Sequence, residues 1–258
     1  METKPLIIFI FLIFILLWEY LKPYKKNLWQ FALLTSRGGK NAFFAVLNTV
    51  LSPLIILPVS ALAYQHALWQ RPDEFIMGWG LAVDILILDI WIYWMHRAMH
   101  EIPFLWRFHQ VHHLDEEMDA TSALRFHFGE VFFSALGRAI VIILFAIPFT
   151  HILVFETIIF CAALFQHGNM RILSPIQSVI SRIIVTPQHH WIHHHIKNGD
   201  LQKHYATIFV WWDTIFGTKS TSARTPDTQI GIPDQKGGKK ADQSILELIV
   251  LPFKKQKP

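Results

Sequence analysis

Five apolar segments dominate the sequence and restrict the folds that it can adopt. The first three cover residues 6–18, 42–64 and 75–95. A helix needs about 20 mainly apolar residues to cross the hydrocarbon core of a bilayer, and the first segment is slightly shorter than that. Pro53 and Pro58 lie in the second segment, where membrane helices tolerate proline as a kink. We therefore expect three membrane-spanning helices, the first of them a retained anchor.

The other two apolar segments are shorter. They cover residues 131–147 and 152–165, and only residues 148–151 separate them. Two adjoining segments of this length suit a hairpin that enters the bilayer and returns to the same side. The sequence thus predicts an all-α integral membrane protein with three spanning helices and a membrane hairpin, capped by a helical region rich in histidine.

Charges in the short loops predict the orientation in the membrane. The loop after the first segment carries five basic residues against one acidic residue, namely Lys22, Lys25, Lys26, Arg37 and Lys40 against Glu19. In the loop of residues 66–74, Arg71 is offset by Asp73 and Glu74. Because basic loops stay on the cytosolic side, we expect a multi-pass protein whose histidine-rich region and C-terminus are cytosolic.

The composition excludes several classes of protein. Hydrophobic residues make up 52% of the chain and charged residues 16%, whereas about a quarter of a soluble domain is charged. So apolar a chain is not disordered. The net charge of +4 is too small to indicate a nucleic-acid partner. Cys161 is the only cysteine, which excludes a disulfide framework and a cysteine-based metal site.

Histidine is in excess, with fifteen residues against five tyrosines. His96 and His100 follow the third apolar segment directly and are four residues apart, so they share one face of a helix. Two further clusters repeat offsets of three and four residues: His109, His112 and His113, then His190, His193 and His194. Single histidines stand at positions 127 and 167.

These clusters indicate a metal site. One divalent ion takes about four to six ligands, so eight or more convergent histidines imply two ions. Neutral imidazole suits iron, zinc, copper and nickel rather than magnesium or calcium. A histidine tract on the surface is the alternative, but three clusters at the ends of apolar helices, all on one inferred side of the membrane, favour the metal site.

A hydrolytic zinc site fits less well. The zincin motif is absent, because His100 and Glu101 are followed by Ile102, Pro103 and Phe104 without a second histidine. Such a site also needs only about three protein ligands. A metal-binding or transport protein and a metal-dependent lipid hydrolase remain as alternatives to an oxygen-using enzyme.

The histidine motifs and the motifs around them follow one another in an order that is specific to one protein family. The order runs HRAMH (96–100), WRFHQVHH (106–113), RFHFGE (125–130), QHGN (166–169), TPQHHWIHH (186–194) and WWDTIFGT (211–218). Over about residues 84–218 the chain resembles the fatty acid hydroxylase/sterol desaturase superfamily. The resemblance implies an integral membrane enzyme with a non-haem di-iron centre, which uses dioxygen to hydroxylate or desaturate a fatty acyl, sphingolipid or sterol-like substrate.

The resemblance also implies a ligand set. Its nine members are His96, His100, His109, His112, His113, His167, His190, His193 and His194. His127 is a possible tenth ligand or outer partner, although Phe128 stands where the family often has proline. His204 replaces the asparagine of a D-x-N-Y-G-like motif and is either an extra ligand or a surface substitution. His189 and His195 flank the third cluster and are left out.

Some polar residues invite a structural or a functional interpretation. Asp84 and Asp89 lie inside an apolar segment, where a charge is costly and usually functional. Asp89 is two helical turns before His96, so it either orients a ligand histidine or is a buried carboxylate paired with an arginine. For Arg125 and Glu130, an ion pair that braces His127 is favoured over catalysis.

The resemblance finally implies partners and regions. Because the chain shows no flavin or haem motif, electrons must come from a separate protein, such as a ferredoxin or a b-type cytochrome. A lipid would reach the site from the bilayer, and no nucleic acid is expected. We predict anchor helices in residues 1–75, the catalytic domain in 76–218, and in 219–258 a polar loop with a short membrane-surface segment.

Overall fold

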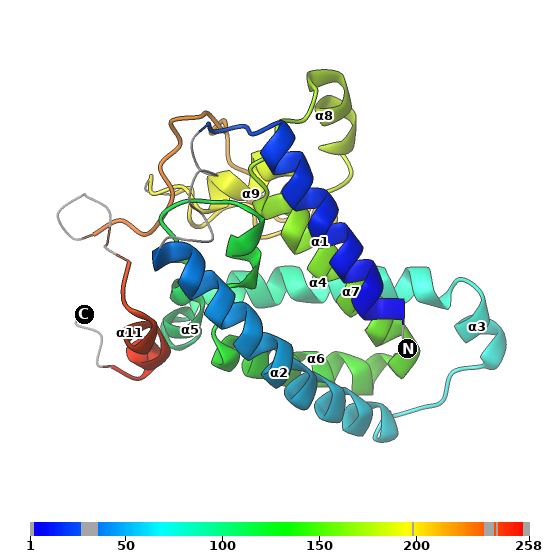
Figure 1. The fold of residues 1–258 in the computed structure, drawn as a ribbon. Helices are drawn as coiled ribbons and strands as arrows, with labels where there is room; N and C mark the ends of the chain where they lie inside the picture. The colour runs from blue at the N-terminus through cyan, green and yellow to red at the C-terminus, as the bar shows by residue number, and fades with distance from the viewer. Residues whose placement is uncertain (1–2, 27–35, 198, 235–239, 241, 255–258) are drawn as a thin grey trace.

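Helices form all the regular secondary structure in the residues that the computed structural model describes, which are 3–26, 36–197, 199–234, 240 and 242–254 (Figure 1). The α-helices are α1 (Thr3–Leu21), α2 (Ser36–Gln65), α3 (Asp73–Met77), α4 (Gly80–Glu101), α5 (Pro103–His113), α6 (Phe128–Phe145), α7 (Phe149–His167), α8 (Ser174–Ile180), α9 (Pro187–His193), α10 (Trp211–Ile215) and α11 (Ile245–Val250). Two 3-10 turns are η1 (Ala120–Leu124) and η2 (Leu251–Phe253). The all-α prediction is confirmed.

Three of the described helices are long and apolar enough to cross a membrane. They are α2, over Arg37–Gln65, α6 and α7. The number agrees with the prediction, but only α2 is one of the three spans that were expected. The apolar part of α1, Leu6–Leu21, is shorter, and α4 lies outside the set.

The predicted hairpin corresponds to α6 and α7. These helices begin at Phe128 and Phe149, each before its apolar run, and contain 18 and 19 residues. At about 1.5 Å per residue, each is close to the roughly 30 Å of a hydrocarbon core. Each helix includes a first turn that precedes its apolar run, so both helices are longer than the apolar runs indicated.

The long helices form two pairs with α4 between them. Figure 1 shows α6 along α2 and α7 along α1. The chain turns between α6 and α7 at Ala146, which has a left-handed φ of 49°. Leu88 of α4 packs with Ile142 of α6 and with Ile152 and Phe155 of α7. As a result, α5 and α9 gather at one end of the bundle, where α4 and α7 end and α6 begins (Figure 1).

Of the two buried aspartates of α4, Asp84 is paired with an arginine. Its carboxylate lies 2.8 Å from the Arg71 guanidinium and accepts a hydrogen bond from His151 Nδ1 at 2.7 Å. All three side chains are at least nine-tenths buried. This carboxylate therefore holds the connection after α2 against the start of α7.

Asp89 follows neither of the two interpretations. Its oxygens accept the backbone N–H groups of Ile208 and Phe209, each at 3.0 Å, and the indole N–H of Trp212 at 2.7 Å. No described histidine or arginine donates to it. Asp89 thus fixes the segment that leads into α10.

The predicted ion pair between Arg125 and Glu130 does not form. Arg125 is fully buried, binds the carboxylate of Asp242 and lies 3.8 Å from that of Asp115. Arg37 of α2 also binds Asp115, at 2.5 Å. Glu130 is the nearer residue in sequence, but the Arg125 side chain points towards Asp242 of the C-terminal segment instead.

That C-terminal segment packs onto the histidine-rich end. Leu248 of α11 lies in a core cluster with Phe44, Val111 and Leu114. The carbonyl of Ile249 accepts a hydrogen bond from His127 Nε2 at 3.0 Å. The predicted surface segment is therefore also part of the support for α5 and α6.

The end of α1 and the segment after it are tied to the same end of the bundle. Glu19 is buried and accepts the backbone N–H groups of Ala120 and Asn169, at 2.9 and 2.6 Å. The Arg224 guanidinium lies between the rings of Tyr24 and Trp191, 3.9 and 3.7 Å from their centroids. These contacts join the first helix to the third histidine cluster.

Candidate metal centre

Four helices bring the nine predicted ligand histidines to one place. The C-terminal parts of α4 and α7 supply His96, His100 and His167. Helix α5 supplies His109, His112 and His113, and α9 with the residue after it supplies His190, His193 and His194. Pro103 starts α5 immediately after the extended Ile102, so the chain turns sharply between the first two clusters. Offsets of three and four residues then direct the rings of each helix to one side.

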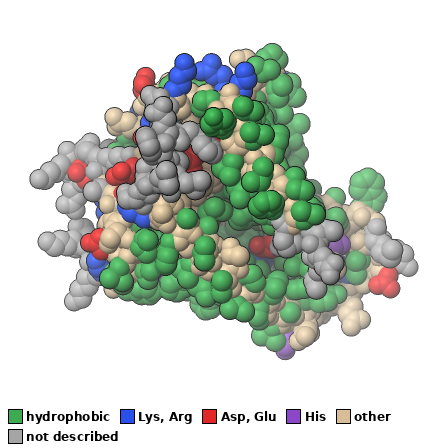
Figure 2. Space-filling view, viewed as in Figure 1, with side chains coloured by type: hydrophobic (Ala, Val, Ile, Leu, Met, Phe, Trp, Pro, Cys, Tyr) green, Lys and Arg blue, Asp and Glu red, His purple; other side chains and the backbone are tan. Residues whose placement is uncertain are grey.

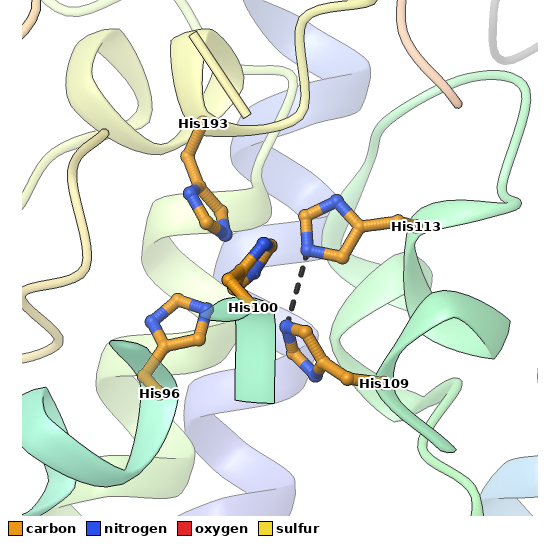
Figure 3. A group of neighbouring side chains, drawn as sticks. All are labelled: His96, His100, His109, His113 and His193. Atoms are coloured by element: carbon orange, nitrogen blue, oxygen red, sulfur yellow. Dashed lines mark hydrogen bonds between the residues drawn. The ribbon is translucent and has the colours of Figure 1, made fainter. Parts of the chain in front are cut away.

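The nine histidines form two groups, and all nine belong to one or the other. The first group is His96, His100, His109, His113 and His193 (Figure 3). The second is His112, His167, His190 and His194. Within each group, one ring nitrogen from every member lies within 4.8 Å of the others. The two groups adjoin: the ring of His113 in the first group stacks on that of His194 in the second, with centroids 4.1 Å apart.

Four of the rings are held in place by hydrogen bonds from Nδ1. The acceptors are the carbonyls of Tyr205 for His96 (2.9 Å), Ala163 for His167 (2.7 Å) and Lys203 for His193 (2.7 Å), and the Glu130 carboxylate for His109 (2.8 Å). A neutral imidazole that donates from Nδ1 presents the lone pair of Nε2. This is the arrangement by which proteins usually orient a metal-ligating histidine.

The ring nitrogens that make no bond to a carbonyl or carboxylate lie close to one another, and a cation between them would give their lone pairs a partner. Nε2 atoms face one another at 3.1 Å between His109 and His113, and at 3.0 Å between His167 and both His112 and His190. Both ring nitrogens of His100 are buried without a hydrogen-bond partner among the described residues. Because a buried polar atom without a partner is costly, the donor set fits ions placed between these rings.

Burial also keeps these rings neutral. Desolvation lowers the pKa of His113, His190 and His193 well below the ordinary value of 6.5, and the neighbouring histidines lower it further. Neutral imidazole is the form that binds a metal. Histidine groups of five and four members exceed the roughly three ligands of a catalytic zinc site and suit two transition-metal ions.

The two other candidate histidines lie outside both groups. His127 caps α6: its Nδ1 accepts the N–H of Gly129 at 3.0 Å, while its Nε2 donates to Ile249. His204 Nε2 accepts the N–H of Ser220 at 3.1 Å. The backbone of His204 is left-handed, with φ at 56°, a conformation in which asparagine and histidine are enriched. This explains why histidine can replace asparagine there. Because His204 is buried, the alternative of a surface substitution is wrong.

Sequence reasoning missed the groups that hold the ligands. Glu130 was assigned to an ion pair with Arg125 but accepts from His109. The carbonyls of Tyr205 and Lys203 carry no side-chain signal at all. The nearest clue is Asp213 of the WWDTIFGT motif, which accepts the backbone N–H of Tyr205 at 2.8 Å and so positions that residue.

Comparisons with known proteins agree on the class of protein. The model of the fatty acid hydroxylase family matches residues 81–218. The chain is 28% identical over 255 residues to ornithine lipid hydroxylase OlsE of Rhizobium tropici, covering 94% of this chain and 73% of the relative. It is also 32% and 29% identical, each over 155 residues, to the alkylglycerol monooxygenases of Danio rerio and Homo sapiens. Those two matches cover 58% of this chain and about a third of the relatives. No solved structure matches the chain.

Proposed function

The chain belongs to the fatty acid hydroxylase family, and we propose that it is a membrane-bound di-iron oxygenase that hydroxylates or desaturates a lipid. The superfamily that the motifs resemble is thereby confirmed, and with it an oxidoreductase activity. The single observation that carries the di-iron assignment is the convergence of nine histidines, seven of them buried and two half-buried, into two adjoining groups.

The protein's part in the reaction is to hold and shield the site. The first group would hold one iron and the second group the other. When bound, the two irons supply the redox chemistry by which dioxygen takes two electrons from the substrate and two from a donor, giving an alcohol or an alkene together with water. Tyr205, Ala163 and Lys203 orient the ligand rings through their carbonyls. The aromatic rings of Trp106, Phe126 and Tyr205 lie against those of His100, His112 and His96, respectively, and would exclude water from this part of the site.

An apolar cavity between α1 and α7 supports a lipid substrate. Its volume is about 370 Å³, within the usual range for a ligand site. Phe14 and Trp18 of α1, Cys161 and Phe165 of α7, and Val185 line it, and every lining residue is apolar or a thiol. Phe165 is two residues before His167. We infer that a hydrocarbon chain from the bilayer lies here, along the helix whose end carries His167.

The remaining assignments follow from orientation and composition. The basic loop of residues 22–40 supports a cytosolic position for the histidine groups and the C-terminus. From this side a separate ferredoxin or b-type cytochrome would deliver the electrons. The names of the relatives favour a lipid with a polar head or a glycerol ether as the substrate.

Metal content and oxygen dependence together test the function. Purified protein in detergent is expected to contain about two irons per chain and to convert added lipid only when dioxygen and a reductant are both present. Product without dioxygen would indicate the hydrolase alternative. A folded protein that binds metal but converts no lipid would favour a metal-binding role, and a folded protein that binds no metal would contradict the proposal.

Glu130→Gln tests the orientation of His109. The amide keeps the size of the side chain but removes the negative charge that holds the Nδ1 proton, so we expect iron affinity or turnover to fall by about 10–100-fold. Iron retained during dialysis against a chelator and the rate with saturating reductant measure the two effects. Glu117→Gln is the matched control, because Glu117 is partly exposed and pairs with Lys25 instead. Equal loss in both variants would remove Glu130 from this role.

A further inference from the structure

A second cavity is lined by polar and basic side chains. Its volume is about 440 Å³, and it lies where the end of α8, the start of α9, α10 and the segment after Gly217 meet. Arg182, Gln188, His189 and Lys219 are among the residues that line it. The neighbour of His189 along α9 is His190, which belongs to the second histidine group. The cavity therefore adjoins the proposed iron centre but contains none of its ligands.

The charges of this cavity are unbalanced. None of its lining residues is a carboxylate, and neither Arg182 nor Lys219 forms an ion pair with a described residue. Two carboxylates adjoin the cavity and are hydrogen-bonded to groups other than these cations. Asp200 accepts from Ser220 Oγ at 2.7 Å and from His195 Nδ1 at 2.9 Å. Asp213 accepts the backbone N–H of Tyr205 at 2.8 Å and lies 3.7 Å from the ring of His204. Positive charge without a partner favours an anion in this cavity.

Neutral donors accompany the two cations. The backbone N–H of Thr186 donates to His189 Nδ1 at 3.3 Å, so the neutral ring carries its proton on Nε2. That nitrogen has no hydrogen-bond partner among the described residues. Together with the amide of Gln188, it gives the cavity hydrogen-bond donors of the kind that bind phosphate oxygens.

Exposed apolar side chains, here called the apolar rim, stand next in sequence to residues that line the cavity. Val179, Ile183 and Ile215 are exposed, and the exposed ring of Trp211 is fixed by a hydrogen bond of 3.0 Å from its indole N–H to the carbonyl of Arg182. Figure 2 shows hydrophobic side chains over α8 that continue onto α1, with Lys and Arg side chains beside them. Tryptophan and basic residues next to such a surface are typical of the membrane interface.

We propose that this cavity binds the phosphate of an anionic membrane lipid, whose hydrocarbon chains lie against the apolar rim. Arg182 and Lys219 supply the charge, and His189 and Gln188 supply hydrogen bonds. The site goes beyond the proposed function, because it does not require that this lipid be the substrate or that iron be bound. It would seat the histidine-rich end of the protein at a fixed depth against the bilayer.

The test compares the full-length protein in nanodiscs of phosphatidylcholine with and without phosphatidylglycerol. We expect phosphatidylglycerol to raise the melting temperature of the wild type by about 2–4 °C. The double variant Arg182→Gln/Lys219→Gln should lose this shift. Lys197→Gln/Lys254→Gln is the matched control and should keep it, because it removes the same charge from two exposed lysines outside the cavity. Iron content is measured in parallel and should not differ.

Native mass spectrometry of detergent-purified protein gives a second measurement that does not depend on melting. One retained phosphatidylglycerol per chain is expected in the wild type and the control, and none in the cavity variant. An equal shift or equal retention in the cavity variant would overturn the proposal. Inorganic phosphate that stabilises the wild type as much as the lipid, and fails to stabilise the cavity variant, would overturn the lipid as the source of the anion.

Discussion

Replacing His193 with alanine is expected to reduce the bound iron from about two ions per chain to one or fewer and to abolish oxygen-dependent lipid conversion. His193 belongs to the first group, its Nδ1 is held by the Lys203 carbonyl, and its Nε2 is buried without another partner. Loss of a mere outer partner of a ligand costs about 10–100-fold, so loss of the ligand should cost more. His112→Ala should do the same in the second group.

The control for this experiment is another histidine. His66→Ala removes an exposed ring whose Nδ1 donates to the carbonyl of Leu62 at the end of α2. Its iron content and turnover should equal those of the wild type, and all three variants should remain in the membrane fraction. Full turnover in His193→Ala or His112→Ala would exclude that residue from the ligand set.

Replacing Arg125 with alanine is expected to lower the stability by about 3–5 kcal/mol, the usual cost of removing one partner from a buried ion pair. Arg125 is fully buried and binds Asp242, and its Nε also donates to the carbonyl of Val111 at 3.1 Å. The change leaves a buried carboxylate with only the partly exposed Lys40 as its counter-charge. It also removes the polar link between Asp242 of the C-terminal segment and the carbonyl of Val111 in α5.

Thermal unfolding of the purified protein measures this effect. Arg97→Ala is the control, because Arg97 pairs with Glu101 one turn away in α4 and both side chains are partly exposed. Such pairs contribute about 0.3–0.5 kcal/mol, so the melting temperature should hardly move. Equal melting temperatures for both variants would show that the network around Arg125 does not hold the C-terminal segment.

The histidines that converge in the structure could be selected from the sequence because helical offsets place them on common helix faces. His109, His112 and His113 stand three and four residues apart, and the same offsets recur at His190, His193 and His194. Their division into groups was not readable, because His112 and His113 are neighbours in α5 yet belong to different groups. That division depends on how α4, α5, α7 and α9 are arranged around the rings, which no local pattern encodes.

The polar supports of the fold were less predictable. Asp89 could be recognised as unusual, since a carboxylate in an apolar helix needs a partner. Its partners are N–H groups more than a hundred residues later, at Ile208 and Phe209. Arg125 likewise binds Asp242 rather than nearby Glu130. Contacts of this kind depend on tertiary packing, whereas the apolar runs report only local structure, and even they understated the lengths of α6 and α7.

The contacts made by Glu19 and Arg224 bear on how the protein could be engineered. Near the end of the first helix, the Glu19 carboxylate accepts two backbone N–H groups beside the histidine-rich end. In the segment that follows, the Tyr24 ring lies against the Arg224 guanidinium. Removing this helix and the segment after it to obtain a soluble fragment, or replacing them with an unrelated signal anchor, would remove the contact of Tyr24 with Trp191. Trp191 lies in α9 among the histidines of the third cluster. The first helix is therefore part of the packed fold around the histidine groups and not only a membrane anchor.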